Sequence, residues 1–143
     1  MLDINLIREK PDLVRAALKN RQMDASPIDS ILSLDEKRRA LLTEVEQLKA
    51  ERNTVSKEIG KMKDAAEREK KIVAMREVGD KISGLDKEVE NVEAELTRLT
   101  SALPNVPDER TPIGASEEEN VVLRTVGQIP EFDFEPKAHW DLG

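Results

Sequence analysis

Apolar residues recur at alternating intervals of three and four along two long stretches of the chain, and this spacing constrains the fold more than any other feature. Residues 31–62 carry ten such positions, eight of them apolar, with Arg38 and Arg52 as the exceptions. Residues 75–103 carry nine, and all of them are apolar. An a/d repeat of this kind places a single apolar stripe along a helix. The sequence therefore predicts two long helices that pack through these stripes, like the seam of a coiled coil.

The two stripes match when the second helix runs antiparallel to the first. Ile31 then pairs with Leu103 at one end, and Ile59 pairs with Met75 at the other. A hairpin that turns near Glu67 explains this pattern without a second chain. At about 1.5 Å per residue the first helix would be roughly 47 Å long.

Capping residues indicate where the hairpin begins. Ser26, Pro27 and Asp29 suit the N-cap, N1 and N3 positions of a helix. We therefore predict hairpin helices over residues 27–64 and 69–103.

The segment before the hairpin, residues 1–25, is predicted to form short helices, because Pro11 can occupy the first turn of a helix but not its interior. A two-helix rod has little core of its own, so its open base near Leu103 needs a cover. The apolar residues of the first segment, together with Ile28 and Leu32, can provide one. They are Leu2, Ile4, Leu6, Ile7, Leu13, Val14, Ala17 and Leu18.

Residues 104–143 are predicted to form a mostly irregular connector. Two prolines in LPNVP end the helical region, and residues 121–126 alternate like a short strand that ends at Gly127. The expected fold class is all-α: a long antiparallel two-helix coiled-coil hairpin, short N-terminal helices packed at its base, and a connector with a short strand. Residues 1–103 would form the helical arm.

Composition excludes several kinds of site. The chain has no cysteine, one histidine (His139), 2% aromatic and 37% charged residues, so we expect neither a metal site nor a cofactor. The acidic run at 117–119 lies on a polar loop without a pocket to tune its pKa values, so we expect no catalytic residue and no enzymatic activity from these residues alone. The sequence contains no apolar run of about 18 residues and no signal-peptide core. We expect a cytoplasmic protein without membrane contact.

Charge is unevenly distributed along the predicted rod. Residues 49–76 carry nine basic and five acidic residues, a net charge of +4, whereas the other 115 residues sum to −11. A positive end on an acidic protein is typical of an anion-binding surface. Two other interpretations stay open: charged outer positions of a coiled coil are usually a solvated face, and the stems of Arg38 and Arg52 can lie along the seam and set its register.

The aromatic residues bear on the kind of nucleic acid that could bind. Phe132, Phe134 and Trp140 lie far from the rod in sequence, and the chain has no tyrosine. A base-stacking platform for single strands is therefore excluded. A nucleic-acid partner would be recognised by shape and backbone, as the A-form stems of RNA are, and we expect no DNA binding.

Several segments resemble one known family. MLDINLIREKPDLVRAALKNR, LDEKRRALLTEVEQLKAERNTVSKEIG, LPNVP, ENVVLRTVG and FDFEPKAHWDLG are similar, in the same order, to the amino-terminal region of bacterial seryl-tRNA synthetase. The connector sequence DERTPIGASEEEN departs from the commonest family pattern.

The resemblance implies a function and a set of contacts. In that family the hairpin is an arm that binds the long variable arm and the elbow of serine tRNA, and a class II catalytic domain with ATP and magnesium follows in a homodimeric ligase. The RNA-binding residues implied here are Arg52, Asn53, Lys57, Lys61, Lys63, Arg68, Lys70, Lys71 and Arg76. The alternative is a structural coiled-coil module that binds proteins and not RNA.

Overall fold

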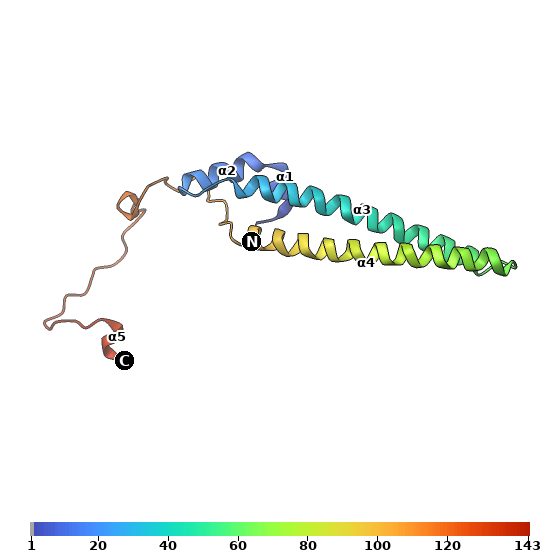
Figure 1. The fold of residues 1–143 in the computed structure, drawn as a ribbon. Coiled ribbons are helices and arrows are strands. Elements are labelled where there is room, and N and C mark those ends of the chain that lie inside the picture. The colour runs from blue at the N-terminus through green and yellow to red at the C-terminus, as the bar shows by residue number, and fades with distance from the viewer. Residues whose placement is uncertain (1) are drawn as a thin grey trace.

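The computed structural model describes residues 2–143; Met1, where the predicted base segment begins, lies outside the described residues. A helical rod carries a cap at one end, and an extended tail leads away from that end (Figure 1). The elements are α1 (Ile4–Glu9), α2 (Pro11–Asn20), α3 (Pro27–Ile59), α4 (Ala65–Ser101), the 3-10 turn η1 (Glu117–Glu119) and α5 (His139–Leu142). Because α3 and α4 pack along each other in opposite directions, the predicted helical hairpin is confirmed.

Burial follows the predicted seam along both long helices. Nine of the ten seam positions in residues 31–62 are buried or half-buried, and Arg52 is the exception. All nine seam positions in residues 75–103 are buried or half-buried. The heptad spacing read from the sequence therefore describes the actual packing, as far as the end of the hairpin.

The core is concentrated at one end of the rod, which we call the base. A single cluster there joins α1 and α2 to the hairpin; it consists of Leu2, Ile7, Val14, Leu18, Ile28, Ile31 and Leu103. Leu32 is partly buried against this cluster, so the predicted apolar cover is present. Leu13 was expected in it, but its side chain is 45% exposed, because it lines an open groove between α2 and residues 106–114.

A buried ion pair, which sequence reasoning missed, fastens α1 to α3. Asp35 is 1% exposed, and its two carboxylate oxygens accept hydrogen bonds from Nε and Nη2 of Arg8, both at 2.9 Å. Arg39 Nε donates a third at 3.1 Å. Two donors from a planar guanidinium fix both distance and orientation, so this pair sets how α1 sits on the hairpin.

The turn of the hairpin comes earlier than predicted. The first long helix ends at Ile59 and the second begins at Ala65, so the turn spans residues 60–64 and does not lie near Glu67. The Asp64 side chain explains the difference, because it accepts hydrogen bonds from the backbone N–H groups of Ala66 (2.8 Å) and Glu67 (3.0 Å). A side chain that satisfies these donors starts a helix at the following residue.

The predicted start of α3 is confirmed, since the helix begins at Pro27 directly after Ser26, but the predicted capping hydrogen bond of Ser26 does not form. Ser26 has helical backbone angles and makes no side-chain capping bond. Its hydroxyl donates instead to Asp24, whose other carboxylate oxygen accepts from the Ser26 backbone N–H at 2.9 Å. A carboxylate is a stronger acceptor than a neutral group, so it holds the serine hydroxyl and removes it from the cap.

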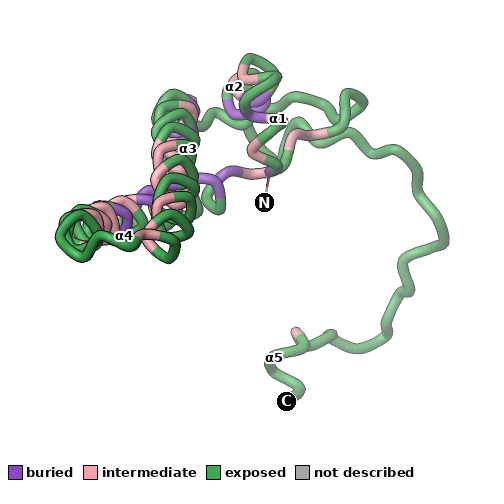
Figure 2. The backbone as a smooth tube through the Cα atoms, turned by 90° about the vertical axis from the view of Figure 1, so that its right-hand side faces the viewer, coloured by how far each residue is buried: buried purple, intermediate pink, exposed green. Residues whose placement is uncertain are grey.

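The predicted strand is absent from residues 2–143, in which no strand forms. Val122 and Leu123 are 78% and 88% exposed, and the tail is exposed along almost its whole length (Figure 2). A strand needs a neighbour that accepts and donates ladder hydrogen bonds, and the described residues offer none. Within the described part of the chain, no helix is both long and apolar enough to span a membrane.

Burial predicts a gradient of amide exchange along the rod. No residue between 46 and 81 is classed as buried, whereas both helices contain buried residues nearer the base. Local opening costs least where few apolar contacts are lost. We therefore expect amides in 52–59 and 65–76 to exchange faster than those in 28–45 in a hydrogen-exchange experiment. Equal protection along the rod would contradict this expectation.

Replacing Asp35 by asparagine is expected to lower the free energy of unfolding at pH 7 by about 2 kcal/mol, because a buried acceptor loses its charge-assisted bonds. Urea unfolding of the variant and the parent measures this difference. Asp86→Asn, in an exposed ion pair with Lys49, is the control and should change stability much less.

The same variant tests a pH dependence. Hydrogen bonding from Arg8 holds the pKa of the Asp35 carboxyl below its usual range, against the opposing effect of burial. Because the pKa is lower in the folded chain, the stabilisation is present above the ordinary aspartate value of about 3.9 and is lost as the pH falls through the folded-state pKa. The stability gap between parent and Asp35→Asn should shrink below about pH 4. A stability difference that stays constant down to pH 3 would show that protonation of Asp35 is not coupled to unfolding.

Candidate nucleic-acid interface

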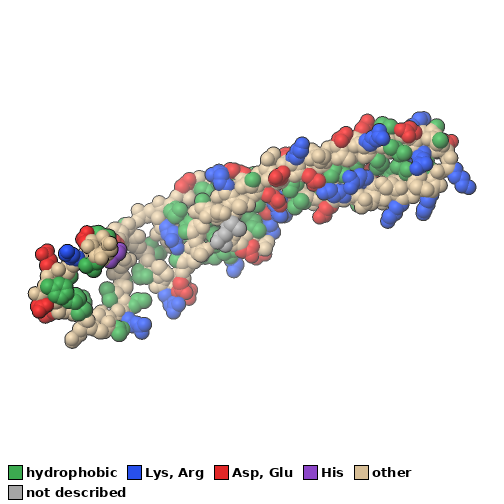
Figure 3. Space-filling model, turned by 90° about the horizontal axis from the view of Figure 1, so that it is seen from below, with side chains coloured by type: hydrophobic (Ala, Val, Ile, Leu, Met, Phe, Trp, Pro, Cys, Tyr) green, Lys and Arg blue, Asp and Glu red, His purple; other side chains and the backbone are tan. Residues whose placement is uncertain are grey.

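The nine predicted contact residues all lie at the end of the rod opposite the base, which we call the tip and define as residues 49–76. Arg52, Asn53 and Lys57 are in the last turns of α3, Lys61 and Lys63 are in the turn, and the remaining four are in the first turns of α4. Eight are exposed and Lys71 is half-buried. Figure 3 shows Lys and Arg side chains projecting from this end of the molecule, at the right.

Ion pairing distinguishes the tip from the base half of the hairpin. Of the six basic residues in 26–48 and 77–103, five form an ion pair, and Lys87 is the exception. Of the nine basic residues in the tip, Lys49 and Lys71 form ion pairs. The other seven have no ion-pair partner among residues 2–143. Most cations of the tip are therefore available to an external anion.

Two ion pairs connect the helices in and beside the tip. Lys71 Nζ lies 2.9 Å from Glu58 Oε2, and this hydrogen bond holds the pKa of the Glu58 carboxyl below its usual range. Lys49 Nζ lies 3.1 Å from Asp86 Oδ1. These two contacts join α3 to α4 and fix the relative position of the helices at the tip.

Two arginines that occupy seam positions have different environments. Arg38 is half-buried, and its Nε donates to Glu93 Oε1 at 2.8 Å. It joins the two helices, as the register interpretation proposed. Arg52 is exposed and has no such partner in the described chain, so its guanidinium is free for a ligand.

Asn53 is the one uncharged residue among the nine. Its side chain is exposed and makes no hydrogen bond with the described residues. A free amide has two donors and one acceptor, so it can bind a ribose hydroxyl or a base edge while neighbouring cations bind phosphates. The arrangement at the tip suits recognition of a polyanion.

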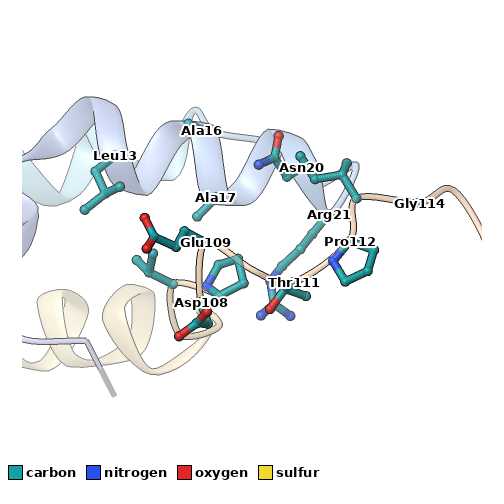
Figure 4. Close-up of a pocket in the computed structure, with 13 residues that line it drawn as sticks. Leu13, Ala16, Ala17, Asn20, Arg21, Asp108, Glu109, Thr111, Pro112 and Gly114 are labelled. Atoms are coloured by element: carbon teal, nitrogen blue, oxygen red, sulfur yellow. The ribbon is translucent and has the colours of Figure 1, made fainter. Parts of the chain in front are cut away.

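A separate groove, which sequence reasoning did not predict, lies at the base between α2 and residues 106–114 (Figure 4). Its volume is about 560 Å³, and Leu13, Ala17 and Ile113 contribute apolar walls. Arg21 Nη2 donates to the Asn105 carbonyl at 3.1 Å and holds the connector against α2. The groove is at the far end of the rod from the tip, so it belongs to a different surface.

Comparison with known proteins identifies close relatives. A family model described as "Seryl-tRNA synthetase N-terminal domain" matches residues 1–107. The serine-tRNA ligase of Roseiflexus sp. (strain RS-1) is 54% identical over the whole chain, and that of Listeria monocytogenes serotype 4b is 46% identical. The chain spans 34% of the length of each, which is about a third.

Two solved structures are similar in fold. Seryl-tRNA synthetase from Pyrococcus horikoshii, complexed with ATP, has a TM-score of 0.78 and 36% identity over 85% of this chain and 28% of its own. Cytoplasmic serine-tRNA ligase from Naegleria fowleri, in complex with AMP, has a TM-score of 0.70 and 28% identity, covering 95% of this chain and 30% of its own. In both cases the match is to a minor part of a longer protein.

Arg52 offers a test of whether the tip is built for stability. It interrupts the apolar seam between Leu48 and Val55, so Arg52→Leu should raise the free energy of unfolding by about 1 kcal/mol through new burial. Urea unfolding measures the change. Arg38→Leu is the matched comparison, and it should gain less because it leaves Glu93 without its partner. A loss of stability in Arg52→Leu would mean that the arginine stem already packs in the seam.

Proposed function

Because the chain belongs to the seryl-tRNA synthetase N-terminal domain family, we propose that it is the tRNA-binding arm of a serine-tRNA ligase. The arm grips the long variable arm and the elbow of serine tRNA. It thereby positions the acceptor end of the tRNA for aminoacylation in a catalytic domain. The observation that carries the proposal is a difference in ion pairing. Seven cations at the tip have no ion-pair partner, whereas five of the six cations in the rest of the hairpin form ion pairs.

The shape of the molecule supports a positioning role. With 33 residues in α3, the rod is about 50 Å long at about 1.5 Å per residue. Its base is held by the apolar cluster and the Arg8–Asp35 pair, and its cations are at the opposite end. Such a rod can bind RNA far from the site of chemistry while its own residues take no part in the reaction.

The remaining parts of the enzyme belong to the same proposal. The relatives are named as serine-tRNA ligases and are about three times as long as this chain. We assign the ligase reaction, ATP and magnesium to a catalytic domain beyond the arm, and we place the complete enzyme in the cytoplasm as a homodimer. In that arrangement the arm and the catalytic domain bind one tRNA together.

The alternative function, a structural coiled-coil module that binds proteins, is not favoured by the family to which the chain belongs. The free charges of the tip also count against it. Interfaces between proteins exclude lysine from their buried centre, whereas four of the seven unpaired cations here are lysines.

A salt titration of tRNA binding tests the proposal. The ligands are serine tRNA and the same tRNA without its long variable arm, and the protein is either the 143-residue chain or its Lys57→Glu, Lys61→Glu variant. We expect tighter binding to the intact tRNA and a loss of about tenfold or more in the variant, with the salt dependence reduced by about one unit of slope per lost phosphate contact.

The control variant makes the same charge change elsewhere. Lys19→Glu, Lys87→Glu alters two exposed lysines outside the tip that form no ion pair with a described residue, and it should change affinity little at physiological salt. If the two tRNAs bind equally well, or if both double variants behave alike, the tip is not the RNA-binding surface and protein partners become the better hypothesis.

A further inference from the structure

Ion pairs between α3 and α4 mark two long edges of the rod. One edge, which we call the paired edge, carries Lys37–Glu88, Glu44–Lys81 and Glu58–Lys71. The other, which we call the open edge, carries Arg38–Glu93 and Lys49–Asp86. In the heptad that the burial pattern defines, Lys37 and Glu44 occupy g positions and Lys49 occupies an e position. Positions e and g flank the seam on opposite sides, so the two sets of pairs lie on different faces.

The open edge loses its ion pairs toward the tip. One heptad beyond Lys49–Asp86, the opposed e positions are Ser56 and Gly79. A Cβ atom added to Gly79 would have no heavy atom within 4 Å, so this part of the edge is open to solvent. By contrast, the paired edge continues to the tip through Glu58–Lys71. The two edges therefore differ most in ion pairing at the tip, where the cations without an ion-pair partner lie.

The charged side chains of the tip are also distributed unequally between the two edges. Arg52 and Arg68 occupy a positions, which lean toward the e side of a helix, and Arg76 occupies a b position, which adjoins e. In this part of the open edge they face one glutamate, Glu69. The paired edge of the tip and its border carry four glutamates and two lysines: Glu51, Glu58, Glu67, Glu77, Lys70 and Lys71. One edge is thus cationic and the other is acidic.

We propose that the RNA backbone lies along the open edge of the tip, over Ser56 and Gly79, and that the paired edge faces away from it. The proposal rests on the proposed function and adds which side of the rod the RNA occupies. Arginine guanidinium groups bind phosphate through two parallel hydrogen bonds, so Arg52, Arg68 and Arg76 supply the phosphate contacts. Asn53, at the b position of α3, is on the same side.

The small residues give the phosphates room to approach. Serine and glycine at the opposed e positions leave the helix backbones near the surface, so an A-form stem, whose minor groove is wide and shallow, can lie close to the arginines. An internal glycine costs a helix about 1 kcal/mol relative to alanine. Access for RNA is a reason for glycine at position 79 that packing within the hairpin does not provide.

Two pairs of matched variants of the 143-residue chain test the edge. Glu69→Lys and Glu77→Lys make the same charge reversal on α4, eight residues apart, at exposed carboxylates without an ion pair in the described structure; Glu69 is on the open edge and Glu77 borders the paired edge. We expect Glu69→Lys to strengthen binding to serine tRNA by about threefold or more, because it replaces a repelling carboxylate with a cation beside the phosphates, and Glu77→Lys to strengthen it clearly less.

The second pair of variants changes no charge and tests whether RNA needs the open space beside Gly79. Gly79→Leu and Gly84→Leu replace two α4 glycines that both have open space for a side chain, and leucine favours a helix at either position. Position 84 is a c position, away from the open edge. Gly79→Leu should weaken RNA binding by about tenfold, whereas Gly84→Leu should leave it unchanged. Circular dichroism should show that both variants remain folded.

The outcomes separate this inference from the proposed function. Equal gains in Glu69→Lys and Glu77→Lys, or a harmless Gly79→Leu, would overturn the assignment to the open edge. Binding to the tip would still stand if the Lys57→Glu, Lys61→Glu variant failed to bind, because Lys57 is on the outer face and Lys61 is in the turn. If that variant also bound normally, the proposed function itself would fail.

Discussion

The closed base of the hairpin is the constraint on which the rest of the structure depends. Two helices that meet along a single seam bury few residues each, and here full burial stops well before the tip. The apolar cluster under α1 and α2, together with the buried Asp35 held by Arg8, provides a core at one end. Because that end is fixed, the other can project into solvent as a rod. The free end can then carry unpaired charges that a compact core would exclude.

Ion pairing differs between the two ends of the rod. Near the base, cations and carboxylates face each other across the two helices and neutralise one another. At the tip the cations exceed their partners, and the few ion pairs present hold the helices in register. Cations that repel each other do not stabilise the fold, so we expect the anions that neutralise them to belong to another molecule. A net charge of −7 on the whole chain therefore does not prevent a cationic surface at the tip.

Positioning RNA, which is the proposed role, and catalysing a reaction make different demands on structure. Binding through phosphates requires cations in a defined geometry on a stiff support, and the seam and the ion pairs of the hairpin supply that stiffness. Catalysis requires a pocket in which titratable groups are tuned by burial. Among residues 2–143, Asp35 is the one strongly buried carboxylate; it is bound by Arg8 and Arg39 and serves to hold α1 in place.

The sequence by itself determined the hairpin, the location of its core at the base and the cationic tip, because heptad spacing and local composition depend only on residues near one another in the chain. It misplaced the turn, and it placed Ser26 correctly at the start of α3 but expected a capping bond that does not form, because carboxylates at Asp64 and Asp24 took roles that periodicity does not reveal. It predicted a strand at residues 121–126 that finds no partner in the described chain. Tertiary structure alone decided that Asp35 is buried, that Arg38 is paired while Arg52 is free, and that the two edges of the tip carry opposite charge. Each of these depends on which residues of α3 face which residues of α4 or α1, and that pairing exists only once the helices pack.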